Sequence, residues 1–151
     1  MNTSVNSCGP GAQRWARGAH GFSLIELMVV VVILAIVAAI AIPSYRQYVL
    51  QSHRTDAQRV LVVNAQILQR CYTQNFTYNG CPNLATTSPN GYYTVANVVP
   101  AAGTSYTLTA TATGSQTADS NCASFTVDQT ELQTALSAGG ANTSTTCWGG
   151  T

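Results

Sequence analysis

Glu26 is the residue with the clearest chemical potential, because it is a carboxylate at the head of an apolar stretch. Residues 27–42 that follow it are sixteen apolar residues in a row, long enough for a membrane anchor. An ionised carboxylate at membrane depth costs about 3 kcal/mol or more, so it needs a positive partner. Cleavage after Gly21 would create one, the α-amine of Phe22. That amine could pair with Glu26 of its own chain or of a neighbouring copy, and the second pairing would align two subunits.

The segment Gly21-Phe22-Ser23-Leu24-Ile25-Glu26, followed by the apolar run, resembles the class III signal of type IV pilins and pseudopilins. The resemblance implies that a prepilin peptidase cleaves after Gly21 and that the new N-terminus, Phe22, is methylated. It also implies that Glu26, the fifth residue from the cut, acts in assembly with other pilin subunits. The partners implied are those subunits, the peptidase, the membrane and the inner-membrane pilus assembly machinery.

Two plainer interpretations of the same segment are alternatives. An ordinary secretory signal has a basic start, an apolar middle and an Ala-x-Ala site. Arg14 and Arg17 supply the charges and residues 39–41 supply a site, so that the mature protein would start near Ile42. A plain membrane anchor is the second alternative. Neither has a use for Glu26, so the pilin-like interpretation is favoured.

The composition is better suited to a chain that packs against copies of itself than to a free monomer. Charged residues make up 7% of the 151, against about 25% in typical soluble domains. The chain has no lysine, and residues 22–151 hold four arginines and five acids. We predict a cleaved leader at 1–21, a membrane anchor and fibre core at 22–49, and a head outside the cytoplasm at 50–151.

A long helix is predicted from Phe22 to about Tyr72, with a kink at Pro43, because proline removes a backbone donor and crowds the preceding turn. Beyond Pro43, residues suited to packing recur at three- and four-residue steps, which is typical of an amphipathic helix. These positions are Val49, His53, Ala57, Val60, Leu61, Ala65, Leu68 and Tyr72.

Three short strands are predicted, at 92–99, 105–113 and 123–127, from alternation with a period of two. Residues 114–121 should form a turn, and residues 128–151 should be an irregular segment held by Cys147. A small antiparallel sheet needs a partner for its apolar face, and the amphipathic half of the helix is the large candidate. The predicted fold class is therefore α+β, a pilin-like roll of one long N-terminal helix on a small antiparallel sheet.

Four cysteines remain once the leader, with its Cys8, is removed. An even number in an exported chain predicts disulfides rather than free thiols. Three pairings are possible, and the local one closes the shortest loops: Cys71–Cys81 and Cys122–Cys147. The cysteine spacings fit no zinc pattern, so neither a metal nor a cofactor is predicted.

The resemblance extends into the second half of the chain. The segments concerned are 71–75 (Cys-Tyr-Thr-Gln-Asn), 106–110 (Tyr-Thr-Leu-Thr-Ala), Gln116…Asp119…Cys122 and Cys147-Trp148. They are similar to PilE-type minor pilins and to the related DNA-uptake pilins. This implies a minor subunit of type IV pili, in fibres that serve adhesion, twitching motility or fibre assembly. The precursor would be a single-pass inner-membrane protein with its head outside, and the mature form an extracellular fibre subunit.

The alternative functions are a DNA receptor, a pseudopilin of a type II secretion system, and an enzyme. DNA binding needs Lys or Arg against phosphates, and no basic residue follows Arg70, which argues against DNA as a partner. The one basic surface left to consider is a stripe of Arg54, Arg59 and Arg70 along the helix. Pseudopilins often bind calcium, for which Asp119 and Asp128 are too few ligands.

No catalytic residue is predicted, because the single histidine after the leader, His53, falls on the helix face that should pack. An enzyme is therefore the least favoured of the three alternatives. The head is expected to meet other subunits through hydroxyl groups, backbone and the aromatic residues Tyr92, Tyr93 and Trp148.

Overall fold

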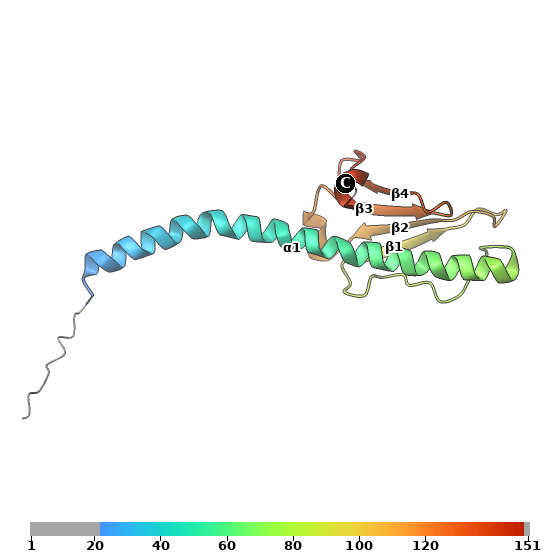
Figure 1. Ribbon diagram of the computed structural model, residues 1–151, viewed down its shortest axis with the longest axis horizontal. Coiled ribbons are helices and arrows are strands. Elements are labelled where there is room, and N and C mark those ends of the chain that lie inside the picture. Colours follow the sequence, from blue (N-terminus) through green and yellow to red (C-terminus); the bar gives the residue numbers. More distant parts are fainter. Residues whose placement is uncertain (1–21, 150–151) are drawn as a thin grey trace, which may run out of the picture. The chain divides into compact units, whose positions relative to one another are not determined.

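In a computed structural model the described residues are 22–149, and the chain divides into two compact units, one ending at Ala39 and one beginning at Ile40. Helix α1, Leu24–Asn75, supplies all the regular structure of the first unit and continues into the second. The second unit adds a sheet, a short 3-10 helix η1, Gly114–Ala118, and a short helix α2, Ser144–Cys147 (Figure 1). The long helix agrees with the sequence prediction and extends three residues beyond Tyr72.

The sheet has four antiparallel strands in the order β1-β2-β3-β4. Their bounds are β1 Tyr93–Val98, β2 Thr107–Ala112, β3 Ser124–Asp128 and β4 Gln133–Leu136. The three predicted strands are confirmed, each shifted or shortened by one or two residues. The prediction for 128–151 was wrong, because that segment contains both β4 and α2. Four residues are too few to display an alternation, and β4 takes its register from its pairing with β3.

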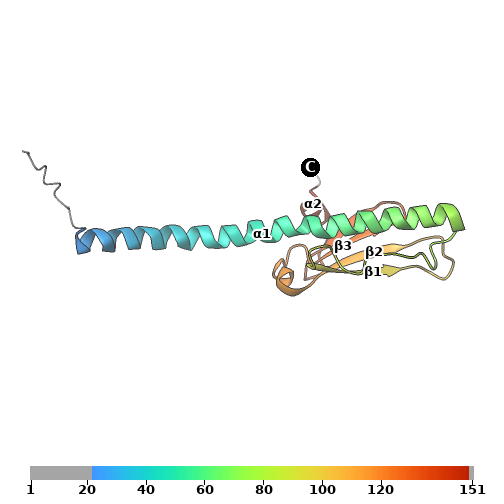
Figure 2. The same cartoon turned by 90° about the horizontal axis from the view of Figure 1, so that it is seen from below.

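The core lies between the second half of α1 and one face of the sheet (Figure 2). The helix contributes the amphipathic face that the sequence predicts, including the fully buried Ala57, Leu61 and Leu68. The sheet contributes cross-strand pairs such as Leu108 with Val127 and Ala110 with Phe125. Each large apolar side chain buried here stabilises the head by about 1.5–3 kcal/mol. The sheet therefore holds the buried half of α1 by apolar contact.

Both predicted disulfides are present, and each fastens an irregular segment to the core. Cys71–Cys81 joins the last turns of α1 to the loop that follows, with 5.9 Å between Cα atoms. Cys122–Cys147 joins the segment just before β3 to α2, with 5.8 Å between Cα atoms. Closing loops of these lengths stabilises a fold by roughly 3 kcal/mol each in the chain-entropy estimate.

Both outer edges of the sheet are closed by irregular segments, so the edges offer little backbone for pairing with another strand. On the β4 side, the Ala135 amide donates to Ser144 Oγ at 2.9 Å, and the Thr143 amide donates to the Ala135 carbonyl at 2.9 Å. On the β1 side, the Val95 amide donates to the Thr86 carbonyl at 2.8 Å. The faces of the head are therefore more available to partners than the sheet edges.

Helix α1 continues through Pro43, and Ser44 Oγ donates to the Ile40 carbonyl at 3.2 Å one turn earlier. The kink at Pro43 stays a prediction. By length and composition the helix is able to cross a membrane, with a mean hydropathy of 3.2 over its most apolar window.

Candidate functional site

Glu26 lies in the first turn of α1 and is exposed to solvent. A carboxylate at this position interacts favourably with the positive end of the helix dipole. Phe22 is 84% exposed, four residues before Glu26, while Gly21 and the predicted leader lie outside the described residues. Within residues 22–149, no cationic group forms an ion pair with the Glu26 carboxylate. The carboxylate is therefore open to a positive group from another molecule.

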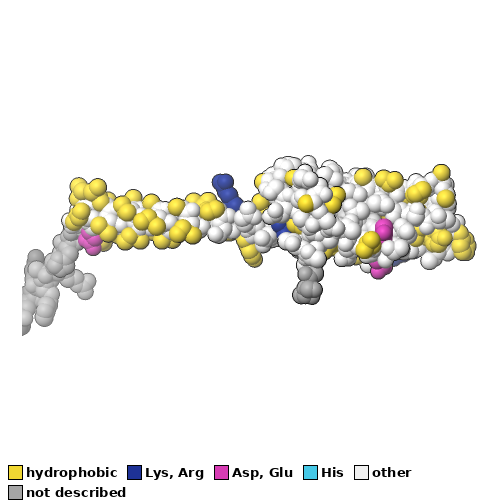
Figure 3. All heavy atoms as spheres, turned by 90° about the horizontal axis from the view of Figure 1, so that it is seen from above, with side chains coloured by type: hydrophobic (Ala, Val, Ile, Leu, Met, Phe, Trp, Pro, Cys, Tyr) yellow, Lys and Arg dark blue, Asp and Glu magenta, His cyan; other side chains and the backbone are white. Residues whose placement is uncertain are grey.

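The apolar stretch after Glu26 is exposed on all sides (Figure 3). Residues 24–42 correspond to roughly 28 Å of helix at 1.5 Å per residue, close to the thickness of a hydrocarbon core. Tyr45 and Tyr48 follow it and are 68% and 70% exposed. Tyrosines of this kind are enriched where a span meets the membrane surface. A helix with these features needs a lipid or protein environment around it.

The head contains one buried ion pair, which joins α1 to the segment after η1. Arg54 Nε donates to Asp119 Oδ2 at 2.7 Å, and a second guanidinium nitrogen donates to Asp119 Oδ1 at 3.0 Å. Both side chains are almost fully buried. The basic stripe of three arginines that the sequence left open therefore does not form, because the Arg54 charge is neutralised inside the head. Both carboxylate oxygens of Asp119 accept hydrogen bonds from Arg54, so Asp119 is not available as a calcium ligand.

Gln116 completes this contact between η1 and α1. Its amide nitrogen donates to the Leu50 carbonyl at 3.0 Å, and its amide oxygen lies 3.0 Å from His53 Nδ1, which donates to it. The His53 ring stacks on Tyr92 with centroids 3.7 Å apart. His53 thus packs at the helix face, as the sequence predicts. Sequence reasoning named Gln116 and Asp119 but missed their contacts with α1: Gln116 lies on η1, Asp119 directly follows it, and both bond to α1.

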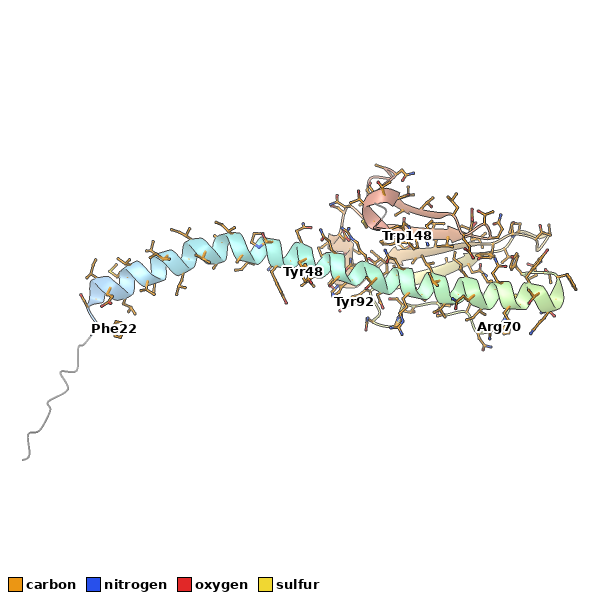
Figure 4. The ribbon with its side chains drawn as sticks, in the orientation of Figure 1. Phe22, Tyr48, Arg70, Tyr92 and Trp148 are labelled. Atoms are coloured by element: carbon orange, nitrogen blue, oxygen red, sulfur yellow. A yellow bond between two sulfur atoms is a disulfide. The ribbon has the colours of Figure 1, made fainter. Side chains whose placement is uncertain are left out.

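Of the three aromatic residues expected on the head surface, one is buried and two are partly exposed. Tyr93 is fully buried, and burial raises the pKa of its hydroxyl to about 12. Trp148 packs edge-on against Phe125 and donates from Nε1 to the Thr134 carbonyl at 2.8 Å. Figure 4 places Trp148 in the C-terminal segment and Tyr92 beside α1. The expectation of an aromatic contact surface was wrong for Tyr93, whereas Tyr92 and Trp148 are partly exposed and contacts through them stay a prediction.

Few charges remain on the head surface. Arg59 and Arg70 are exposed on α1, and Asp128 and Glu131 are accessible on the turn between β3 and β4. Asp56 is buried, where it accepts hydrogen bonds from the backbone amide and the side chain of Asn90.

Comparison with known proteins places most of the chain in two recognised families. Residues 43–126 match the family described as "Type IV minor pilin ComP, DNA uptake sequence receptor". Residues 16–42 match the "Prokaryotic N-terminal methylation motif". The two matches meet between Ile42 and Pro43 and together cover the apolar segment and most of the head.

Similar proteins are fimbrial and pilin proteins. Fimbrial protein EcpC of Eikenella corrodens is 37% identical over 94 residues, which cover 60% of this chain and 61% of the relative. Prepilin peptidase-dependent protein D of Escherichia coli (strain K12) is 38% identical over 62 residues, 41% of this chain and 42% of the relative. The chain thus spans less than two thirds of the length of these relatives. A type IV pilin structure from Shewanella oneidensis is 32% identical, with a TM-score of 0.47, over 56% of this chain and 89% of that one.

Proposed function

We propose, because the chain belongs to the type IV minor pilin ComP family, that it is a fibre subunit whose assembly depends on Glu26 and a new N-terminus at Phe22. In this proposal the precursor is held in the inner membrane by residues 22–49, with its head outside the cytoplasm. A prepilin peptidase cuts after Gly21, and the amine of Phe22 is methylated. The inner-membrane pilus assembly machinery then moves the subunit into the fibre.

The observation that carries the proposal is Glu26 at the start of a wholly exposed apolar helix. During assembly the carboxylate attracts the α-amine of a neighbouring subunit and sets its register. The apolar helices then exchange lipid contacts for contacts with each other, and burial against water stabilises the product by about 25 cal/mol per Å². The Glu26 pair contributes alignment more than stability, because desolvation offsets most of its Coulomb attraction.

The test is Glu26→Ala in the full-length chain, compared with wild type in membrane and sheared-fibre fractions. We expect normal processing and normal head disulfides but a strong loss from fibres, because the carboxylate is exposed and belongs to a compact unit separate from that of the head. Mass spectrometry of the wild-type protein should find an N-methylated Phe22 at the N-terminus. A start near Ile42, or normal incorporation of the variant, would refute the mechanism.

A DNA receptor is the second candidate, favoured by the description of the matched family as a DNA uptake sequence receptor. The head offers little charge for phosphates, since Arg54 is neutralised by Asp119 and exposed cations in 50–149 are limited to Arg59 and Arg70. Two phosphate contacts would give an affinity that falls with salt at a log-log slope of only about −1.8.

DNA binding by the full-length protein in detergent decides between the candidates. The fibre-subunit proposal expects no retention of DNA at physiological salt. A salt-dependent affinity that disappears in Arg59→Ala/Arg70→Ala would instead establish the receptor. The pseudopilin alternative is less favoured, because Asp119 is not available for calcium in the described head.

A further inference from the structure

The outward face of α1 carries an exposed basic patch. Arg59 and Arg70 are both exposed, and Val62 and Val63 between them are 41% and 45% exposed. The eleven residue steps from Arg59 to Arg70 correspond to roughly 17 Å of helix and about three turns, so both arginines fall on nearly the same side. Figure 4 shows Arg70 toward the C-terminal end of the helix. We call these four residues the basic helix face.

The turn between β3 and β4 carries the opposite charge. Asp128 and Glu131 are accessible there, and Leu132 beside them is 59% exposed. Asp128 Oδ1 accepts from Thr130 Oγ1 at 2.6 Å, from the Thr130 amide at 2.8 Å and from the Leu132 amide at 3.1 Å, which fixes the turn. The Thr130 hydroxyl in particular holds the pKa of Asp128 below its usual range, so the turn stays negative. We call Asp128, Glu131 and Leu132 the acidic turn.

The two patches do not neutralise each other within one head. A groove of about 430 Å³ separates α1 from the turn, with Val62, Gln66 and Gln69 on one side and Glu131 on the other. Within residues 22–149 the one ion pair is Arg54–Asp119, which is buried elsewhere. In Figure 3 the acidic atoms visible on the head gather in one region of its surface. Both patches are therefore open to a partner.

We propose that the acidic turn of one copy of this chain docks on the basic helix face of a second copy, with Leu132 covering Val62 and Val63. The acids then approach the flanking arginines, and the exposed apolar side chains leave water together. The partner is a second copy because one head carries both halves of the contact. One half has two cations and two valines, and the other has two acids and a leucine. The two surfaces differ, so the contact is heterologous and repeats in one direction, as a filament requires.

Charge complementarity supplies orientation and specificity in this contact. A copy arriving with its acidic turn against another acidic turn is repelled, and the same holds for two basic helix faces. The inference rests on the proposed function in one respect: the fibre is where copies of the chain would come together. It concerns the heads and is independent of the Glu26 contact between the N-terminal segments.

The test is a charge swap read by photo-crosslinking in the full-length protein. A photoreactive amino acid replaces Leu132 in one tagged copy, a second copy carries a different tag, and both membrane and sheared-fibre fractions are irradiated. The expected product contains both tags and maps to the peptide holding Val62 and Val63. Arg59→Glu/Arg70→Glu in the second copy should lower its yield by at least about tenfold, because like charges then face each other.

Glu131→Arg in the photoreactive copy should restore the product with the Arg59→Glu/Arg70→Glu copy. Asn97→Glu/Thr104→Glu is the matched control, since it adds acids at exposed positions on β1 and its following loop and should leave the yield unchanged. A product insensitive to the arginines, a loss that the swap does not restore, or capture of another pilin alone would overturn the proposal. Absence of the wild type from fibres would instead contradict the proposed function, while the membrane fraction would still test the contact.

Discussion

Tyr93 is fully buried, yet its hydroxyl has no hydrogen-bond partner among residues 22–149, a property it shares with Tyr106. A buried hydroxyl without a partner costs free energy relative to a phenyl ring. Its ring, by contrast, packs edge-on against Phe125 with centroids 5.7 Å apart. The ring therefore stabilises the core while the hydroxyl does not.

We expect Tyr93→Phe to leave the free energy of unfolding at pH 7 unchanged or to raise it. Burial raises the pKa of Tyr93 to about 12, whereas an unfolded tyrosine ionises near pH ~10. Wild-type stability should thus fall as the pH rises from 10 toward 12, by roughly 3 kcal/mol from this residue, because the unfolded chain releases its proton first. Denaturant titrations at pH 7 and above pH 10 should show that the variant lacks this loss. Tyr45→Phe, at an exposed position, serves as the control and should keep the wild-type pH dependence.

Arg54 and Asp119 form an ion pair whose contribution to stability depends on its burial. Arg54→Met should lower the free energy of unfolding by roughly 3–5 kcal/mol, because it leaves the Asp119 carboxylate buried without its cation. Arg54→Met/Asp119→Leu should recover most of that loss, since removing both charges also removes their desolvation cost. Chemical denaturation measures all three proteins. Arg59→Met changes an exposed arginine of the same helix and should stay within about 0.5 kcal/mol of wild type; an equal loss there would contradict this account.

At the scale of elements, the parts that sequence predicted best are those with long-range repetition. The buried positions of α1 and the alternating threonines of β2 repeat over enough residues to fix both the element and its core face. The element β4 has four residues and no such repetition, and its position depends on pairing with β3. Likewise, the motif around Glu26 is local and was recognisable, whereas the pairing of Arg54 with Asp119 spans 65 residues and needed the fold.

The C-terminal segment is held by a disulfide and a few hydrogen bonds, so its disulfide should matter more than the other. Cys122→Ala/Cys147→Ala should cost about 3–4 kcal/mol, and Cys71→Ala/Cys81→Ala somewhat less, because the loop of 25 residues is longer than that of 10. Cys122 and Cys147 are also almost fully buried, whereas Cys81 is partly exposed. Thermal unfolding of the two double variants ranks them, and a larger loss for the Cys71–Cys81 pair would contradict the prediction.

At the scale of the whole molecule, the two units use their apolar residues differently. Every residue from Phe22 to Tyr48 is exposed, and the first buried residue of α1 is Arg54. The head therefore completes its core without the N-terminal segment. The segment in turn has no partner within the described chain, so its apolar surface is available to lipid first and to other subunits later.

This division predicts that residues 50–151 fold alone. The fragment keeps every buried side chain of the described chain, and it keeps the Leu50 carbonyl that Gln116 needs. We expect a soluble protein with native circular dichroism, both disulfides and one cooperative unfolding transition. A fragment of residues 60–151 loses Arg54 and Ala57, which leaves Asp119 unpaired and opens the core, so it should be largely unfolded. If 50–151 aggregated or unfolded without cooperativity, folding of the head would depend on residues 22–49. Assembly could then not be described as the association of heads that are already folded.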